Sequence, residues 1–214
     1  MRFLVVGAGA LGGYFGGRLL AAGGDVTFLL RPGRAAQIAR NGLVIRSGAG
    51  DLTLPSPPRV LAEDIGAPYD VVIVGCEAYD LAQTMESFAP AVGPDTAILP
   101  VLNGMRHLDQ LAARFGGDKV LGGYCMISAT LDAEGTVVHF GDMHGLSFGE
   151  RYNLPDADYA THGGCFPINV AGAGIVGCVT ISGLPQRDDH NLVVETLCLV
   201  TGRDYASLRL APAS

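Results

Sequence analysis

The chain has 214 residues, of which 49% are hydrophobic and 16% are charged, and its net charge is −7. This length allows one large domain, or one domain with an extension. The acidic balance offers no basic surface for nucleic acid, and no apolar run approaches the roughly 18 residues of a membrane span. The cysteines show no CxxC pair and no metal-ligand spacing, which favours buried thiols in a reducing cytoplasm.

The first hundred residues alternate short apolar runs with segments of helical periodicity. Residues 10–24 place Leu11, Phe15 and Leu19 on one helical face, and Gly23 and Gly24 end this helix. Strands that alternate with helices predict a doubly wound, mostly parallel sheet with helices on both faces. The expected strands are 2–7, 25–31, 69–75 and 96–104, the other expected helices are 78–90 and 106–116, and a hairpin is expected over 43–55.

The remainder of the chain has a different character. Residues 121–130, 135–141 and 145–150 are predicted to form an antiparallel extension of the first domain. After a boundary placed at 150–152, residues 151–214 mix Gly, Pro, Cys and β-branched residues without a clear helical period, and only 190–210 is expected to hold a helix. The sequence therefore predicts a nucleotide-binding domain over 1–150 and an irregular C-terminal region over 151–214.

A glycine pattern at the first strand-to-helix turn is the strongest functional signal. The first glycine of a GxGxxG motif permits a tight turn, the second admits a pyrophosphate, and the third lets helix and strand pack closely. This context predicts a Rossmann-like dinucleotide site, although a purely structural turn in a glycine-rich chain is the alternative. The residues of the motif are Gly7, Ala8, Gly9, Ala10, Leu11 and Gly12.

Two further polar residues follow expected strands. Enzymes that use NAD usually have an acid after the second strand, whereas this chain has Arg31, which favours the 2′-phosphate of NADP. The alternative is a solvated arginine in a surface loop. Asn103 follows a later strand, where such sheets bind ligands, and is expected to contact nicotinamide, ribose or substrate unless it serves only an Asn-Gly turn.

Taken in order, these segments resemble 2-dehydropantoate 2-reductase, or ketopantoate reductase. The resemblance rests on MRFLVVGAGALGGYFGGRL at the start, Arg31, EAYDL, LPVLNGM and EGTVVHFG with LSFGE, and it covers residues 1–150. It implies that NADPH reduces the 2-keto acid ketopantoate to (R)-pantoate in pantothenate synthesis. It also implies that Gly7 to Gly12 bind the pyrophosphate, that Arg31 binds the 2′-phosphate, and that the catalytic candidate Asn103 lies between cofactor and substrate.

The sequence departs from the family pattern at the lysines. The family has a lysine where this chain has Glu77, and a second lysine, the general acid, in a helical C-terminal domain. Here the single lysine of the chain is Lys119, in an expected surface loop. His139 and His144 are further proton donors in principle, but a packing or surface role is the simpler interpretation.

These departures leave three hypotheses of function. The first is a ketopantoate reductase impaired by its missing lysines, the second is a non-catalytic NADP-binding module, and the third is another small β-hydroxyacid or opine-type dehydrogenase. The unusual tail suggests a frameshifted gene. A sheet without its normal second domain also favours association, such as a homodimer, or instability.

Overall fold

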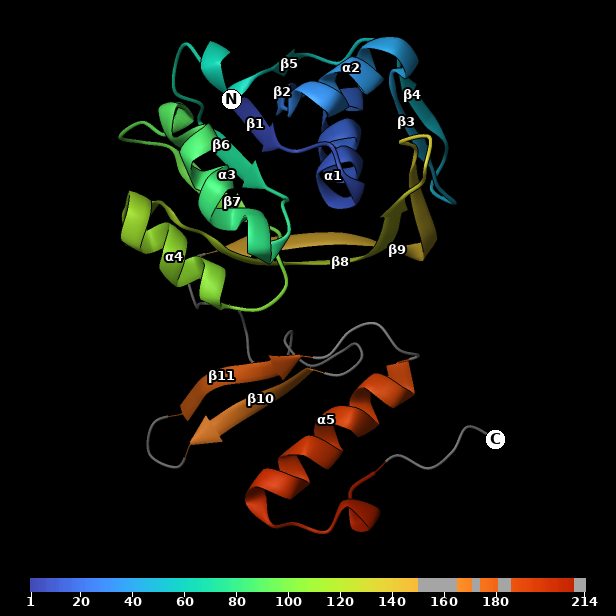
Figure 1. Ribbon diagram of the computed structural model, residues 1–214, viewed down its shortest axis with the longest axis vertical. Coiled ribbons are helices and arrows are strands. Elements are labelled where there is room, and N and C mark those ends of the chain that lie inside the picture. The colour runs from blue at the N-terminus through green and yellow to red at the C-terminus, as the bar shows by residue number, and fades with distance from the viewer. Residues whose placement is uncertain (150–164, 171–173, 181–185, 210–214) are drawn as a thin grey trace. The chain divides into compact units, whose positions relative to one another are not determined.

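The computed structural model describes residues 1–149, 165–170, 174–180 and 186–209 (Figure 1). The chain divides into two compact units, Met1–Asn153 and Leu154–Ser214. Within the described residues, no helix combines the length and apolar character that a bilayer span requires.

A five-stranded sheet, in the order β5-β2-β1-β6-β7 with every pair parallel, forms the centre of the first unit. Successive residues of β1 enter opposite cores, because Leu4 and Val6 pack with one hydrophobic cluster and Val5 with the other. This architecture confirms the Rossmann-like doubly wound prediction. The strands are β1 (Arg2–Val6), β2 (Asp25–Leu29), β5 (Arg59–Val60), β6 (Val71–Val74) and β7 (Ala97–Pro100).

Helices cover both faces of this parallel sheet (Figure 1). The helices α3 (Leu81–Phe88) and α4 (Arg106–Phe115) contribute to one core, and α1 (Ala10–Ala21) and α2 (Pro32–Asn41) to the other. Helix α2 was not predicted from the sequence, although a proline at the first helical position is a recognised start signal. Single 3₁₀ turns lie at Ala62–Asp64 (η1), Ala78–Asp80 (η2), Ala89–Ala91 (η3) and Gly117–Lys119 (η4).

A separate mixed sheet has the order β4-β3-β9-β8 and contains the predicted hairpin and antiparallel extension. The two strands expected over 135–141 and 145–150 form one continuous strand, β9, which contains a β-bulge between the two expected segments. Ile127 pairs with His144 and the next residue, Ser128, pairs with Phe140, so the intervening residues of β9 bulge out of the ladder. The strands are β3 (Leu43–Arg46), β4 (Leu52–Leu54), β8 (Gly122–Leu131) and β9 (Val137–Gly149).

Helix α1 lies between the two sheets and contacts both through glycine. A Cβ at Gly12 would lie 2.2 Å from the Gly7 carbonyl oxygen, and one at Gly13 would lie 2.8 Å from Val137. Gly16 and Gly17 repeat this arrangement one turn later. The leucines expected to form the helix's packing face are only half-buried, and the buried residues of α1 are its four central glycines and Tyr14.

The second unit contains an antiparallel pair, β10 (Cys165–Val170) and β11 (Gly174–Thr180), and a helix, α5 (Gln186–Thr201) followed by the 3₁₀ turn η6 (Tyr205–Ser207). A helix was expected within 190–210, and the structure confirms one, although it begins earlier and ends at Thr201. Val193, Val194 and Cys198 are buried, whereas Leu199 and Val200 are 80% exposed.

Replacing Gly12 by alanine tests the close approach of α1. We expect Gly12→Ala to lower the free energy of unfolding by about 3 kcal/mol. The new methyl group would overlap the Gly7 carbonyl oxygen, which can move only if the turn after β1 changes its conformation. Urea denaturation followed by circular dichroism measures the change.

The matched control is Gly33→Ala in α2, where an added Cβ has nothing within 4 Å. Alanine is the better helix former, so this variant should be neutral or gain up to about 1 kcal/mol. Equal effects of the two substitutions would contradict the packing argument.

Candidate functional site

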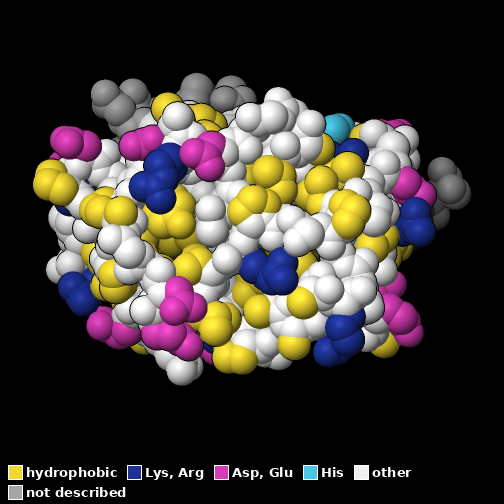
Figure 2. Space-filling view, turned by 90° about the horizontal axis from the view of Figure 1, so that it is seen from above, with side chains coloured by type: hydrophobic (Ala, Val, Ile, Leu, Met, Phe, Trp, Pro, Cys, Tyr) yellow, Lys and Arg dark blue, Asp and Glu magenta, His cyan; other side chains and the backbone are white. Residues whose placement is uncertain are grey.

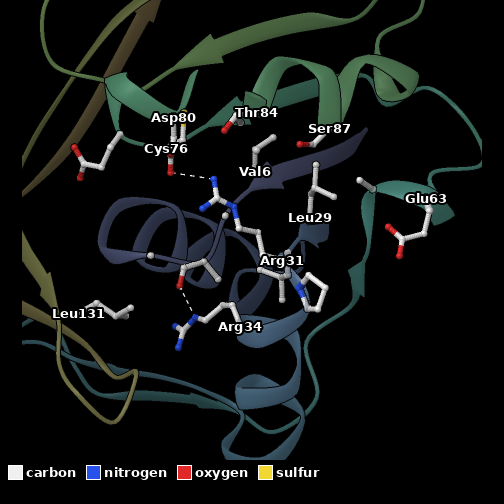
Figure 3. A pocket seen from close by; sticks show the side chains of 17 residues that line it. Val6, Leu29, Arg31, Arg34, Glu63, Cys76, Asp80, Thr84, Ser87 and Leu131 are labelled. Carbon is white, nitrogen blue, oxygen red and sulfur yellow. Dashed lines mark hydrogen bonds and ion pairs between the residues drawn. The ribbon is translucent and has the colours of Figure 1, made fainter. Parts of the chain in front are cut away.

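A cavity of about 390 Å³ opens at the carboxyl ends of the parallel strands (Figure 3). The sheet order places β1 between β2 and β6, so the chain passes to opposite sides of β1, which is where doubly wound sheets bind ligands. The lining comes from the turn after β1, the end of β2 and the start of α2, η1, the segment between β6 and α3, α3 itself, and the end of β8. Its members include Gly7, Ala8, Gly9, Arg31, Arg34, Glu63, Cys76, Glu77, Asp80, Thr84 and Ser87.

The turn after β1 has the geometry that the glycine motif predicts. Gly7 has a φ of 87°, which L side chains rarely adopt, and its N–H donates to the Leu29 carbonyl at 2.9 Å. The first hydrogen bond within α1 runs from the Gly13 N–H to the Gly9 carbonyl. The amides that precede Gly13 in the first turn therefore have no partner within the helix. No side chain caps this helix and its first turn holds no acid. This end of α1 therefore suits an anionic group.

Arg31 lies at the end of β2, as expected, but it has a partner that the sequence did not reveal. Its Nη2 donates to Asp80 Oδ2 at 2.9 Å (Figure 3). The Arg31 side chain is 67% exposed and that of Asp80 is 32% exposed, and both line the cavity. The position after β2 therefore holds a guanidinium and a carboxylate together.

Arg34, which the sequence analysis did not propose as a site residue, braces the glycine turn. Its Nε donates to the Ala8 carbonyl and its Nη1 to the Gly135 carbonyl, both at 2.9 Å. Nη1 also donates to Gln37 Oε1 at 2.6 Å. Burial lowers the pKa of Arg34, yet a guanidinium stays charged at neutral pH, so this positive charge lies beside the turn.

Carboxylates balance the guanidinium groups around the cavity. Glu63, Glu77 and Asp80 line it together with Arg31 and Arg34. Burial raises the pKa of the Cys76 thiol, so this side chain remains protonated and acts as a small apolar group beside Thr84. Figure 2 shows one face of the molecule, on which basic and acidic side chains are interspersed and neither sign dominates.

Asn103 is exposed in the turn after β7, where Gly104 has a φ of 85°, and it is not among the residues that line the cavity. Strands lie about 4.8 Å apart, so Arg31 and Asn103 mark positions about 14 Å apart along the carboxyl edge of the sheet. The first three residues of the glycine motif, Gly7 to Gly9, line the cavity. The other three, Ala10 to Gly12, are the first residues of α1 and are not among the lining residues.

The other proton-donor candidates lie elsewhere. Lys119 Nζ donates to the carbonyl of Pro94. Pro94 precedes β7, so this contact lies at the amino ends of the parallel strands, opposite the cavity. His139 Nε2 lies 2.9 Å from the Met143 carbonyl, which can only accept, so in the neutral ring Nδ1 accepts from the Ser47 hydroxyl at 2.8 Å. Both nitrogens of this buried ring are engaged, which supports a packing role. Among the described residues, no cluster of His, Cys, Asp or Glu could hold a metal ion.

Comparison with known proteins assigns the first unit. The family model "Ketopantoate reductase PanE/ApbA" matches residues 3–153. The uncharacterized oxidoreductase YkpB of Bacillus subtilis is 46% identical over 150 residues, which are 70% of this chain and 49% of YkpB. The crystal structure of 2-dehydropantoate 2-reductase from Geobacter metallireducens aligns with a TM-score of 0.65 and 35% identity, over 74% of this chain and 52% of that one. The chain thus spans about half the length of these relatives.

The C-terminal region matches a different family, "Haem degrading protein HbpS-like", over residues 135–198. A UPF0303 protein of Acidobacterium capsulatum is 63% identical over 67 residues, which are 31% of this chain and 41% of that protein. This finding corrects the frameshift hypothesis, because an out-of-frame reading has no reason to preserve such identity with a separate protein. The glycine turn, the strand order and the family match over residues 3–153 agree with one another, and the chain belongs to the ketopantoate reductase PanE/ApbA family.

Proposed function

We propose that this chain is an oxidoreductase of the ketopantoate reductase type, which binds NADPH along the carboxyl edge of its parallel sheet and reduces 2-dehydropantoate to (R)-pantoate. The observation that carries the proposal is the common cavity of the Gly7–Gly9 turn and Arg31, next to the uncapped end of α1. Family membership supports the oxidoreductase class.

The groups around the cavity fit a dinucleotide in one direction. The open amides at the start of α1 would receive the pyrophosphate, since backbone N–H groups and the helix dipole both favour an anion there. Arg31, at the β2 side, would receive the 2′-phosphate. The nicotinamide end would then lie toward β6 and β7, where Glu77 and Asn103 follow their strands.

Bound NADPH would supply a hydride to the keto carbon of the substrate, and the oxygen of that carbonyl would then require a proton. The Asn103 side-chain amide can donate a hydrogen bond to this oxygen and stabilise the developing negative charge, but it is a poor proton source. Glu77 is exposed at the cavity, and its carboxylate would oppose both the alkoxide and the carboxylate of a 2-keto acid.

This opposition supports a second candidate, a non-catalytic NADP-binding module. Lys119 lies at the far edge of the sheet, and no lysine follows it in the sequence. The cofactor cavity would then persist without the donor that ketone reduction needs. A role in pantothenate synthesis depends on the first candidate, whereas a cytoplasmic location and a homodimer are part of the proposal under either candidate.

One sample separates the two candidates. We expect calorimetry to detect NADPH binding, and Arg31→Ala to weaken it about tenfold or more, because the guanidinium is a charged phosphate contact. The matched control is Arg40→Ala. Arg31 is the N-cap residue of α2, and Arg40 is exposed in the last turn of that helix. NADPH consumption with 2-dehydropantoate then indicates the enzyme, and binding without consumption indicates the module. If NADPH does not bind at all, both candidates are wrong.

Glu77 provides a second test. We expect Glu77→Lys to increase affinity for 2-dehydropantoate, or to raise turnover, because the substitution replaces a repelling charge with an attracting one near the nicotinamide end. Initial rates at several substrate concentrations measure both quantities. Glu195→Lys, an exposed position on α5, is the control for the change in net charge. An unchanged response at Glu77 would show that this carboxylate does not face the substrate.

A further inference from the structure

We infer that Asp80 selects between NADPH and NADH in this chain, and that it does so through its ion pair with Arg31. The inference rests on the proposed binding of a nicotinamide dinucleotide in the cavity and adds the residue that sets cofactor preference. Asp80 lies 49 residues from Arg31 along the chain, which is why a motif search confined to the end of the second strand does not find it.

The orientation of the Asp80 side chain is the first observation. Asp80 occupies the N-cap position of α3, where an aspartate ordinarily accepts a hydrogen bond from the first turn of its own helix. Here its side chain makes no such bond and points across the cavity to Arg31 Nη2 instead (Figure 3). The carboxylate is thus directed to the position where the ribose of a bound dinucleotide would lie.

The chemistry of the two cofactors differs at this one position. A carboxylate near the end of β2 accepts a hydrogen bond from the 2′-hydroxyl of NADH, as the acid does in most NAD-binding Rossmann folds. The same carboxylate repels the 2′-phosphate of NADPH, which needs the guanidinium. The Arg31–Asp80 pair therefore presents a group suited to each cofactor, and each group weakens the preference that the other would impose.

Other charges around the cavity do not relieve this competition. The second guanidinium, that of Arg34, is engaged with the Ala8 and Gly135 carbonyls through Nε and Nη1, and its Nη2 is buried without a partner. Glu63 and Glu77 add two further carboxylates to the lining. Arg31 is thus the cation most open to a 2′-phosphate, and Asp80 shares it. The unmodified chain should accept both cofactors with a small preference.

Removing the carboxylate charge should shift that preference toward NADPH. For Asp80→Asn, we expect the dissociation constant of NADPH to fall about fivefold while that of NADH stays equal or rises. The effect is modest because both side chains are partly exposed, so solvent and salt screen the repulsion. Isothermal titration calorimetry with each reduced cofactor measures the two constants, and it suits a chain without tryptophan.

Glu86→Gln is the matched control. Glu86 also lies on α3 and forms an ion pair with an arginine, Arg114 Nε, at 3.1 Å, but neither residue lines the cavity. The two variants change net charge equally and break one arginine–carboxylate pair each. The control should leave the ratio of NADPH to NADH affinity unchanged, and melting curves establish that both variants are folded.

Four results would overturn the inference. A ratio that is unchanged in Asp80→Asn, or an affinity for NADPH that falls, would show that Asp80 does not oppose the 2′-phosphate, while leaving the proposed function intact. An equal shift in Glu86→Gln would attribute the effect to net charge. Failure of the unmodified chain to bind either cofactor would overturn the proposed function together with this inference.

Discussion

The close packing of α1 between two sheets is the constraint on which the first unit depends. Gly12 and Gly16 allow the helix to approach the parallel sheet, where the nearest side chains belong to Val5 and Phe28. Gly13 and Gly17, one position further, allow it to approach the mixed sheet. Residues four apart lie on the same face of a helix, so Gly12 with Gly16 and Gly13 with Gly17 give α1 two neighbouring faces that lack side chains. The N-terminus of α1 is thereby held against the turn after β1, with its open amides at the cavity.

The electrostatics of the cavity follow from this placement. The positive end of α1 and the two arginines attract an anion, and the carboxylates of Glu63, Glu77 and Asp80 limit how strongly they do so. Arg34 contributes mainly by position, because it ties α2 to the glycine turn and to the turn between β8 and β9. In the proposed binding mode, the phosphates of a dinucleotide lie near the helix end and the Arg31–Asp80 pair faces the 2′ position.

The chain belongs to the ketopantoate reductase PanE/ApbA family, and its residues 135–198 are similar to a second family; in each case it covers only part of its relatives' length. The part that matches the PanE/ApbA family contains the cavity proposed to bind the cofactor, whereas the resemblance assigned the general acid to a helical domain. The HbpS-like match covers residues 135–198, and no lysine follows Lys119 in the sequence. Binding and chemistry are therefore separable questions in this protein.

Much of the fold follows from local sequence patterns. The strands β1, β2, β6 and β7, the helices α1, α3 and α4, and the hairpin of β3 and β4 all lie where apolar runs and glycine signals predict them. Helix α2 was missed because its weakly apolar segment begins with arginine and proline and resembles a surface loop. The continuity of β9 was missed because a bulge can be recognised only from the partner strand.

The sequence by itself determined that a glycine turn joins a buried strand to a helix, and that an arginine follows the second strand, because both depend on neighbours a few residues apart. Tertiary structure decided the remaining features. It places Asp80 beside Arg31 and Arg34 beside the Ala8 carbonyl, and it places Lys119 at the amino ends of the strands, opposite the cavity. These contacts join segments that are distant in the chain, and only the order of the strands and the close approach of α1 make them neighbours.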